Sequence, residues 1–262
     1  MFNRILAAML IAWSAFPAAA NAGWSIGASL EDYRWQEFIV GRSETPLETG
    51  VRSTVNVEWA QDGDYGWLFA YRGKLYFGQV QYDTYTQQTY TPVSTTTHYS
   101  GVAHEAQIFH RTDAANYQLD YVGGLGLDTW QRAIENNGYF QIEDFLIIYL
   151  RGGFNISQPE HGAGLHGGGG LKYPIMTRED AHLDSMGFSS NPILQPGKDI
   201  SLYAQLGYRI SARWDVVAYY DSWRFKQSPK VTSTKISDGK LYDIWQPKSS
   251  MDAFGLRVMY SF

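Results

Sequence analysis

The chain has 262 residues, a formal net charge of −5 at pH 7 and no cysteine. Without cysteine it has no disulfide scaffold, Cys-ligated zinc, iron–sulfur cluster or catalytic thiol, and with 26 acidic against 21 basic side chains it lacks the basic excess of a nucleic-acid-binding protein. Aromatic residues make up 16% and charged residues 18%, which is too aromatic and too weakly charged for a disordered chain.

Residues 1–22 predict a secretory signal peptide. Arg4 is the only charge, an apolar stretch of 12 residues follows, and Ala20-Asn21-Ala22 fits an A-x-A cleavage site. A retained membrane anchor is the alternative, but the stretch is shorter than the roughly 20 residues that a spanning helix needs. We therefore expect an exported protein whose single domain covers residues 23–262.

The remaining residues alternate between apolar and polar with a period of two. In the segment 50–61, Val51 and Val55 fall on one face while Arg52 and Glu58 fall on the other, as successive side chains of a strand do. No convincing 3.6-residue helical period is present. Ten strands are predicted, over residues 24–38, 50–61, 67–82, 99–111, 116–131, 145–156, 163–175, 200–210, 214–226 and 251–262.

The connections between these strands alternate in length. Those at 39–49, 83–98, 132–144, 176–199 and 227–250 are long, and the ones between them are short. This layout is typical of an outer-membrane barrel, with short periplasmic turns and longer extracellular loops. A soluble Greek-key sandwich, the other all-β architecture, has no reason to place every long loop at one end. The sequence therefore predicts an all-β fold, a transmembrane antiparallel up-and-down β-barrel of about ten strands.

Aromatic residues gather near the predicted short turns. Indole and phenol rings favour the headgroup boundary of a membrane, so we expect an aromatic girdle there, with a row of ordinary core aromatics as the alternative. The predicted girdle consists of Trp24, Trp59, Trp67, Tyr117, Tyr208, Trp214 and Tyr260.

The opposite faces of the strands carry charges of both signs. Buried charges must pair, and a barrel of ten strands is close to the eight-stranded size that side chains just fill. The interior is therefore expected to be a narrow pore or a sealed scaffold. The predicted lumen charge network consists of Arg52, Glu58, Arg72, Lys74, Glu105, Asp120, Asp128, Arg151, Arg209, Asp215, Asp221 and Arg257.

The signal peptide, the strands, the alternating loops and the terminal segment FGLRVMYSF together resemble the Gram-negative outer-membrane β-barrel class. The resemblance covers essentially the whole mature chain. It implies a location in the cell outer membrane, with lipid and lipopolysaccharide as surroundings. It also implies that Phe262, the C-terminal aromatic residue, is an assembly signal for the barrel-assembly machinery.

The fourth long connection contains the pair Asp180-Ala181-His182. A carboxylate can hold an imidazole in the tautomer that general-base catalysis needs. The pair is similar to the Asp-x-His pair in the fourth extracellular loop of the omptin surface proteases, ten-stranded barrels that also carry two Asp residues in the second loop. Here that second loop offers Asp83, but Tyr85 stands where the second Asp would be. An omptin-like endopeptidase with an incomplete catalytic set is therefore the enzymatic alternative.

Two further motifs have non-functional explanations. Residues 162–167 match G-x-G-x-x-G, but no helical pattern follows, so a glycine-rich strand is predicted and not a nucleotide site. Glu179, Asp180 and Asp184 supply oxygen atoms for a divalent cation, yet their spacing matches no calcium loop. No metal site and no cofactor are predicted.

Three functions follow from this sequence. The main expectation is a non-enzymatic envelope barrel with porin-like passage of small solutes at most. The omptin-like protease is the first alternative. The second is a surface adhesin or binding protein, because the second and fifth long connections are rich in Tyr, Ser and Thr, residues that make adaptable contacts.

Overall fold

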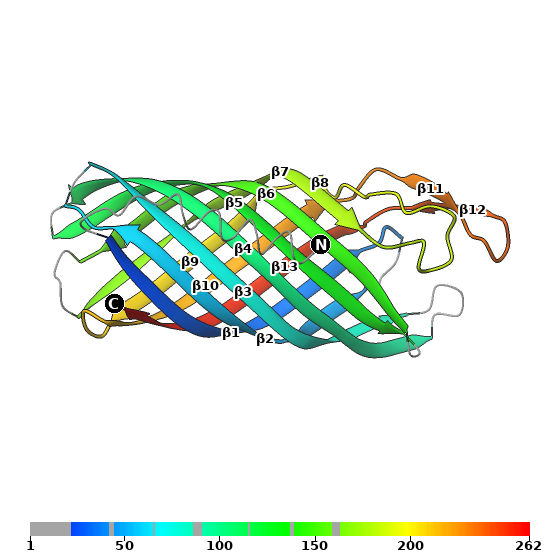
Figure 1. Cartoon of the computed structure of the whole chain (residues 1–262), viewed down its shortest axis with the longest axis horizontal. Coiled ribbons are helices and arrows are strands. Elements are labelled where there is room, and N and C mark those ends of the chain that lie inside the picture. The colour runs from blue at the N-terminus through cyan, green and yellow to red at the C-terminus, as the bar shows by residue number, and fades with distance from the viewer. Residues whose placement is uncertain are drawn as a thin grey trace.

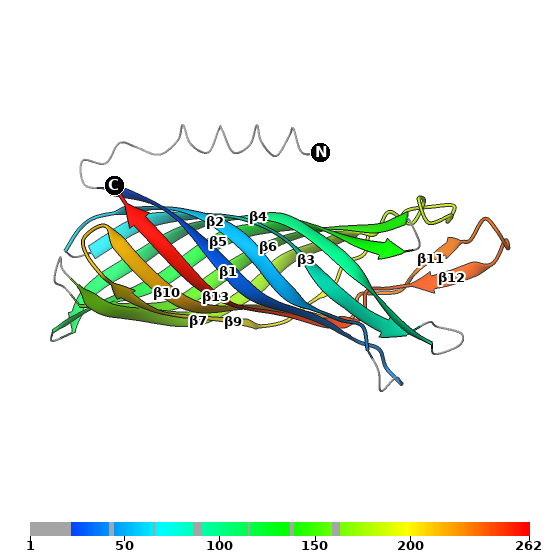
Figure 2. The ribbon, with the colours of Figure 1, turned by 90° about the horizontal axis from the view of Figure 1, so that it is seen from below.

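The computed structural model describes residues 22–41, 45–64, 66–85, 91–114, 116–136, 139–158 and 163–262. In these residues ten long antiparallel strands form one sheet, and its last strand pairs with its first, so that the sheet closes into a barrel (Figures 1 and 2). The predicted all-β barrel is confirmed. Residues 1–21 of the predicted leader lie outside the described part of the chain, and Ala22 begins the first strand.

The long strands follow one another around the barrel in sequence order, which gives up-and-down topology. A two-residue strand, β8 (Gly197–Lys198), adds to the end of β10, and β11 (Val231–Thr234) pairs with β12 (Leu241–Ile244) in a separate hairpin. The ten barrel strands are β1 (Ala22–Phe38), β2 (Leu47–Gln61), β3 (Gly66–Tyr85), β4 (Pro92–Ala114), β5 (Tyr117–Asn136), β6 (Tyr139–Ser157), β7 (Gly164–Asp180), β9 (Ser201–Arg209), β10 (Trp214–Lys226) and β13 (Lys248–Ser261).

The alternation along each strand decides which side chains enter the interior. On β2, Arg52 and Thr54 are each 2% exposed, whereas Val51 and Val55 are 58% and 39% exposed. Closure of the ring pairs each barrel strand on both sides, although β7 pairs with β9 only from Gly164 to Lys172 and then meets the chain again at the isolated bridge between Glu179 and Leu194. The outward row of apolar side chains forms a belt of the kind that lipid surrounds. Among the described residues, no helix is long and apolar enough to span a membrane.

The strands are longer than predicted at the end that carries the long connections. β4 begins at Pro92 and β6 begins at Tyr139, seven and six residues before the predicted starts. The predicted connections 83–98 and 132–144 are therefore too long. In the β4 extension the outward side chains Ser94, Thr96 and His98 are polar, so the hydropathy contrast is lost while the hydrogen-bonded ladder continues. In the β6 extension the outward side chains Phe140 and Ile142 are apolar, and the strand simply begins earlier than predicted.

A β-bulge changes the direction of the side chains in β7. Ile148 pairs with Met176 and Tyr149 with Pro174, so Ile175 is an extra residue on β7. An extra residue shifts the alternation by one position. Lys172 below the bulge and Glu179 above it therefore both point inward, at 3% and 1% exposure, although they are an odd number of residues apart.

Two glycines allow large rings to lie flat against the inner wall. A Cβ atom at Gly126 would come within 2.2 Å of the Tyr149 ring, and one at Gly255 within 2.3 Å of the Tyr219 ring. Glycine in a strand marks such a close approach. These two glycines thus leave room for the Tyr149 and Tyr219 rings against the inner wall.

Candidate functional site

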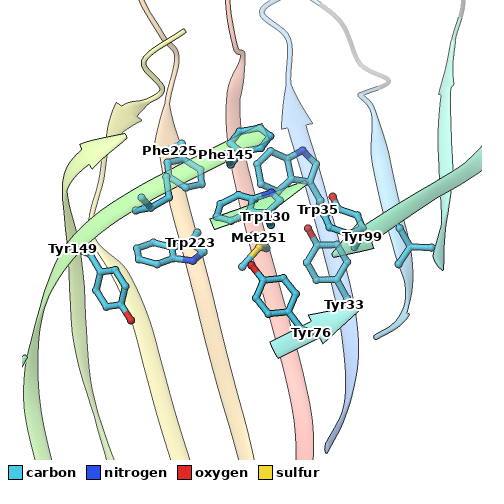
Figure 3. Packing of buried hydrophobic residues seen from close by; sticks show 12 residues of the cluster. Tyr33, Trp35, Tyr76, Tyr99, Trp130, Phe145, Tyr149, Trp223, Phe225 and Met251 are labelled. Atoms are coloured by element: carbon cyan, nitrogen blue, oxygen red, sulfur yellow. The ribbon is translucent and has the colours of Figure 1, made fainter. Parts of the chain in front are cut away.

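A layer of aromatic side chains fills the barrel interior near the end with the long loops (Figure 3). Trp130 stacks on Phe145 with ring centroids 4.8 Å apart, and Trp35 meets both rings edge-on, at 6.5 and 5.7 Å. Trp223 and Phe225 continue the layer from β10. None of these five side chains is more than 3% exposed. The interior is therefore packed at this height and leaves no open bore between these rings.

Hydrogen bonds hold several polar atoms of this layer, whereas the Trp130 indole nitrogen is buried without a hydrogen-bond partner. Trp223 Nε1 donates to Asp128 Oδ2 at 3.1 Å, and the Tyr76 hydroxyl donates to Asp128 Oδ1 at 2.7 Å. Trp35 Nε1 donates to Glu37 Oε1 at 3.1 Å. Asp128, one of the predicted lumen carboxylates, thus anchors two rings of the layer, a role that its sequence position did not indicate.

A buried charge cluster lies above the layer, toward the long loops. Arg132 donates to Glu37 at 3.0 Å, to Glu48 at 2.8 Å and to Glu143 at 2.7 Å. Glu179 is 1% exposed and lies within electrostatic range of Glu143 and Glu37. Four carboxyl groups therefore surround one guanidinium.

Ion pairs also connect the strands below the layer. Arg52 Nη2 lies 2.8 Å from Glu31 Oε2, and Arg111 holds both oxygens of Asp120 at 2.8 and 3.0 Å. Further pairs join Arg151 to Glu105 (2.9 Å), Arg257 to Glu58 (2.8 Å), Lys172 to Asp221 (2.6 Å), His166 to Asp215 (2.9 Å) and Lys74 to Glu31.

The twelve residues of the predicted lumen network all lie in the interior. Arg72 is 3.7 Å from Glu58, Arg209 lines a cavity near the short turns, and the others make the contacts above. The sequence analysis missed Glu31, Arg111 and Lys172, and it missed the whole cluster around Arg132.

The predicted girdle residues lie at the ends of strands that meet the short turns. Trp67, Tyr117, Tyr208 and Trp214 are 65%, 43%, 48% and 47% exposed. Trp59 differs from them, because it is only 5% exposed and lies opposite Trp24 in the β1–β2 register. The Trp214 and Tyr260 rings meet edge-on at 5.0 Å. Phe262 is 81% exposed and its N–H donates to the Trp24 carbonyl at 3.0 Å. The roles of these residues in lipid and in assembly stay predictions.

His182, the residue of the predicted catalytic pair, lies in the loop after β7. Its Nε2 is 2.9 Å from Asp144 on β6, and its Nδ1 is 3.9 Å from Asp180. Its backbone is left-handed, with φ at 48°, and its N–H donates to Asp180 Oδ1 at 3.2 Å. Asp144 is directly opposite Asp180 in the β6–β7 register. A correct pairing of these two strands could therefore have identified Asp144 as a neighbour of the Asp180-Ala181-His182 pair.

This arrangement suits an ion pair better than general-base catalysis. Both imidazole nitrogens face carboxylates, and the hydrogen bond to Asp144 raises the pKa of His182, whereas a general base needs a free nitrogen lone pair. The nearby Ser185 hydroxyl donates to the His182 carbonyl. Asp83 lies on β3 and accepts from Gln81, and in the described part of the chain no hydrogen bond or ion pair joins it to His182.

No family model matches the sequence and no curated relative matches it. Solved structures do match. The outer membrane protease OmpT from Escherichia coli is 12% identical, with a TM-score of 0.55, and the match covers 92% of this chain and 96% of OmpT. The transport unit of the autotransporter AIDA-I from Escherichia coli is 11% identical (TM-score 0.46, covering 91% and 90%), and Neisserial surface protein A is 8% identical (TM-score 0.38, covering 92% and 99%).

The chain has the fold of an outer-membrane β-barrel. Its strand number and closure are those of that class, and the match to OmpT at this identity concerns the fold alone. No group of three or more His, Asp and Glu side chains that could hold a metal ion occurs among the described residues of the barrel.

Two long loops of the outer-membrane barrel dock onto each other. The Ser189 N–H donates to the Thr234 carbonyl at 2.8 Å, and the Ile236 N–H donates to the Gly187 carbonyl at 2.9 Å. The hairpin β11–β12 projects beyond the barrel at the end opposite the C-terminus (Figure 1). We call residues 181–200 and 227–247 together the loop platform.

We expect His182 to anchor this platform in a pH-dependent way. Since its folded pKa is raised above the ordinary value of 6.5, the stabilisation by Asp144 is fully present below that value and is lost as the pH rises through the folded pKa. NMR titration should give a higher pKa for His182 in the wild type than in Asp144→Asn. The matched variant Asp184→Asn should lower it less, because Asp184 makes the weaker charge contact.

Proposed function

We propose that the protein is a non-enzymatic outer-membrane barrel, closed to solutes, that presents a rigid binding platform at the cell surface. The main observation behind this proposal is the loop platform, in which backbone hydrogen bonds join two segments about 45 residues apart in the chain. Outer-membrane barrels carry their longer loops on the extracellular side. The platform would therefore face the medium.

The filled interior favours this function over porin-like passage. Ten strands enclose a space only slightly wider than the eight-stranded size that side chains fill, and the aromatic layer occupies it. A barrel that conducts solutes needs a continuous aqueous path.

The platform has the surface chemistry of a contact site. Ile236 and Leu241 are 69% and 72% exposed at the projecting hairpin, and Met186 is 38% exposed in the neighbouring loop. Neighbouring exposed apolar side chains on an ordered surface are typical of interaction sites. Phe188 and Tyr242 pack edge-on at 6.0 Å and hold the two loops together. An ordered platform loses less entropy on binding than a mobile loop does.

Treatment of intact cells with trypsin tests the orientation. We expect cleavage at Lys240, which is exposed in the turn of the β11–β12 hairpin, while the barrel strands stay intact in the membrane fraction. A Lys240→Gln variant should lose this cleavage. If trypsin cuts the hairpin only after the outer membrane has been opened, the proposed orientation is wrong.

Binding is then measured with cells that display the barrel. Retention on immobilised extracellular proteins and glycans should fall for the double variant Ile236→Ser with Leu241→Ser. The control is Val40→Ser, since Val40 is 91% exposed beside another loop of the same end. Equal retention of all three types of cell would contradict a binding role for the hairpin.

The omptin-like alternative predicts peptidase activity that depends on His182. We expect none, because the imidazole is held between two carboxylates and Asp83 lies elsewhere. The refolded wild type and His182→Ala should be equally inactive toward a panel of fluorogenic peptides, with an omptin as the positive control. Cleavage by the wild type that His182→Ala abolishes would establish the alternative instead.

A further inference from the structure

The interior below the aromatic layer is hollow. A cavity of about 120 Å³ lies directly under Tyr76, Tyr149 and Met251 of that layer. A second cavity of about 280 Å³ shares Arg72 and Arg257 with it and extends to residues 211–213, the short turn between β9 and β10. The two cavities adjoin at these shared residues, and together they make up the space between the rim with the short turns and the aromatic layer. We call it the basal chamber.

Positive charge exceeds negative charge along this chamber. Counted once each, nine Arg and Lys side chains and six Asp and Glu side chains line the two cavities. Glu31, behind Arg52 and Lys74, adds one more carboxylate. The excess of cations remains, within walls that exclude water and strengthen electrostatic attraction.

The excess of positive charge is concentrated where the two cavities meet. Glu58 there lies within electrostatic range of three guanidiniums, those of Arg257, Arg72 and Arg151. Arg257 donates to it at 2.8 Å, but Arg72 approaches no closer than 3.7 Å. In the described residues the Arg72 guanidinium makes no hydrogen bond, although it has five N–H donors.

Three other guanidiniums that line the upper cavity each have one N–H without a hydrogen-bond partner. The Nε atoms of Arg52, Arg151 and Arg257 are buried without a hydrogen bond, and all three residues line the upper cavity. The side chain of Arg52 is 2% exposed. A buried donor without a hydrogen-bond partner destabilises the folded protein, and an anion in the cavity would supply the missing acceptor.

We propose that the basal chamber binds a small soluble polyanion with phosphate or carboxylate oxygens, held where the cavities meet by Arg72, Arg151 and Arg257. Guanidiniums match the planar geometry of such oxygens and bind them in pairs. The chamber volume suits a small molecule and not a polymer. The barrel wall surrounds the chamber, so a soluble ligand entering at the rim fits it and a lipid headgroup does not.

The lack of native cysteine allows a direct test. Gln205 lines both cavities and is replaced by Cys. The refolded barrel is treated with two thiosulfonate reagents, one carrying a sulfonate and one a trimethylammonium group, and each rate is divided by the rate with free 2-mercaptoethanol. We expect the anionic reagent to be favoured by about tenfold or more. Pyrophosphate or citrate should slow its reaction in a saturable way.

Two variants make the test specific. Arg72→Gln should fold normally, because Arg72 makes no hydrogen bond, and it should reduce both the preference and the protection severalfold. Lys240→Gln, in the exposed hairpin, should change neither. Folding of each is checked by heat-modifiable migration in gels. An absence of charge preference, a lack of protection by both anions, or an unchanged response of folded Arg72→Gln would each overturn the proposal.

Discussion

Replacement of Arg132 by Met should destabilise the barrel by about 3–5 kcal/mol, because a buried charge that loses its partner is left uncompensated. Here one guanidinium serves Glu37, Glu48 and Glu143, with all three contacts at 3.0 Å or less. Equilibrium unfolding in urea, in detergent micelles or vesicles, measures the loss. If the variant refolds poorly, the yield of heat-modifiable protein reports the same effect.

Two comparisons separate charge from packing. Arg34→Met removes an exposed guanidinium from β1, near the same end of the barrel, and should change stability by no more than about 0.5 kcal/mol. Adding Glu143→Gln to Arg132→Met should restore part of the stability, because one unpaired carboxylate is removed. A loss that Glu143→Gln does not reduce would show that Arg132 acts mainly by filling space.

Removal of two indoles from the aromatic layer should convert a closed barrel into a conducting one. The wild type should show no stable current steps in planar lipid bilayers, because Trp35 and Trp223 are both fully buried in the layer. The double variant Trp35→Ala with Trp223→Ala should show them, since the space of two large rings becomes available to water and ions. Each Trp→Ala change also costs about 3–5 kcal/mol of stability, so the folded fraction is isolated first.

The control for this experiment is Trp67→Ala. Trp67 is 65% exposed on the outer surface, far from the layer. Its removal should leave the barrel closed. Large stable current steps from the wild type, or the absence of current steps from the folded double variant, would contradict the assignment of the aromatic layer as the seal.

The fold could be predicted from the sequence because a barrel in lipid needs apolar side chains on its outer face and tolerates polar ones on its inner face. Val51 and Val55 point outward and Arg52 points inward, and a period of two records that contrast directly. The alternation of long and short connections then favoured a barrel over a sandwich. Each predicted lumen residue lies inside because its strand carries an apolar face that fixes the register.

The charge cluster above the aromatic layer escaped prediction for the opposite reason. Glu48, Arg132 and Glu143 lie one or two residues beyond the predicted strand ends at 50, 131 and 145. On β5 the hydropathy contrast is reversed there, with Ile134 facing inward and Glu135 facing outward, so the pattern does not mark Arg132 as an inward residue. Glu179 was missed because the predicted strand ends at residue 175, whereas β7 continues to Asp180. The extra residue Ile175 also shifts the alternation, so a longer strand without the bulge would have placed Glu179 on the other face.

The His182 site shows a limit of short motifs. An Asp-x-His pair in a long loop indicated a base, whereas the decisive partner is Asp144, 38 residues away in sequence and on the neighbouring strand. Cross-strand register, and not spacing along the chain, determines which carboxylate meets the imidazole.

The position of the aromatic layer divides the barrel interior into two parts of opposite character. On the side of the long loops, four carboxyl groups surround Arg132 and all are buried. On the side of the short turns, cavities remain and cationic side chains outnumber anionic ones. A solute that enters from the short turns therefore meets a basic surface that ends at rings of indole and phenyl, and it has no contact with the acidic cluster beyond them.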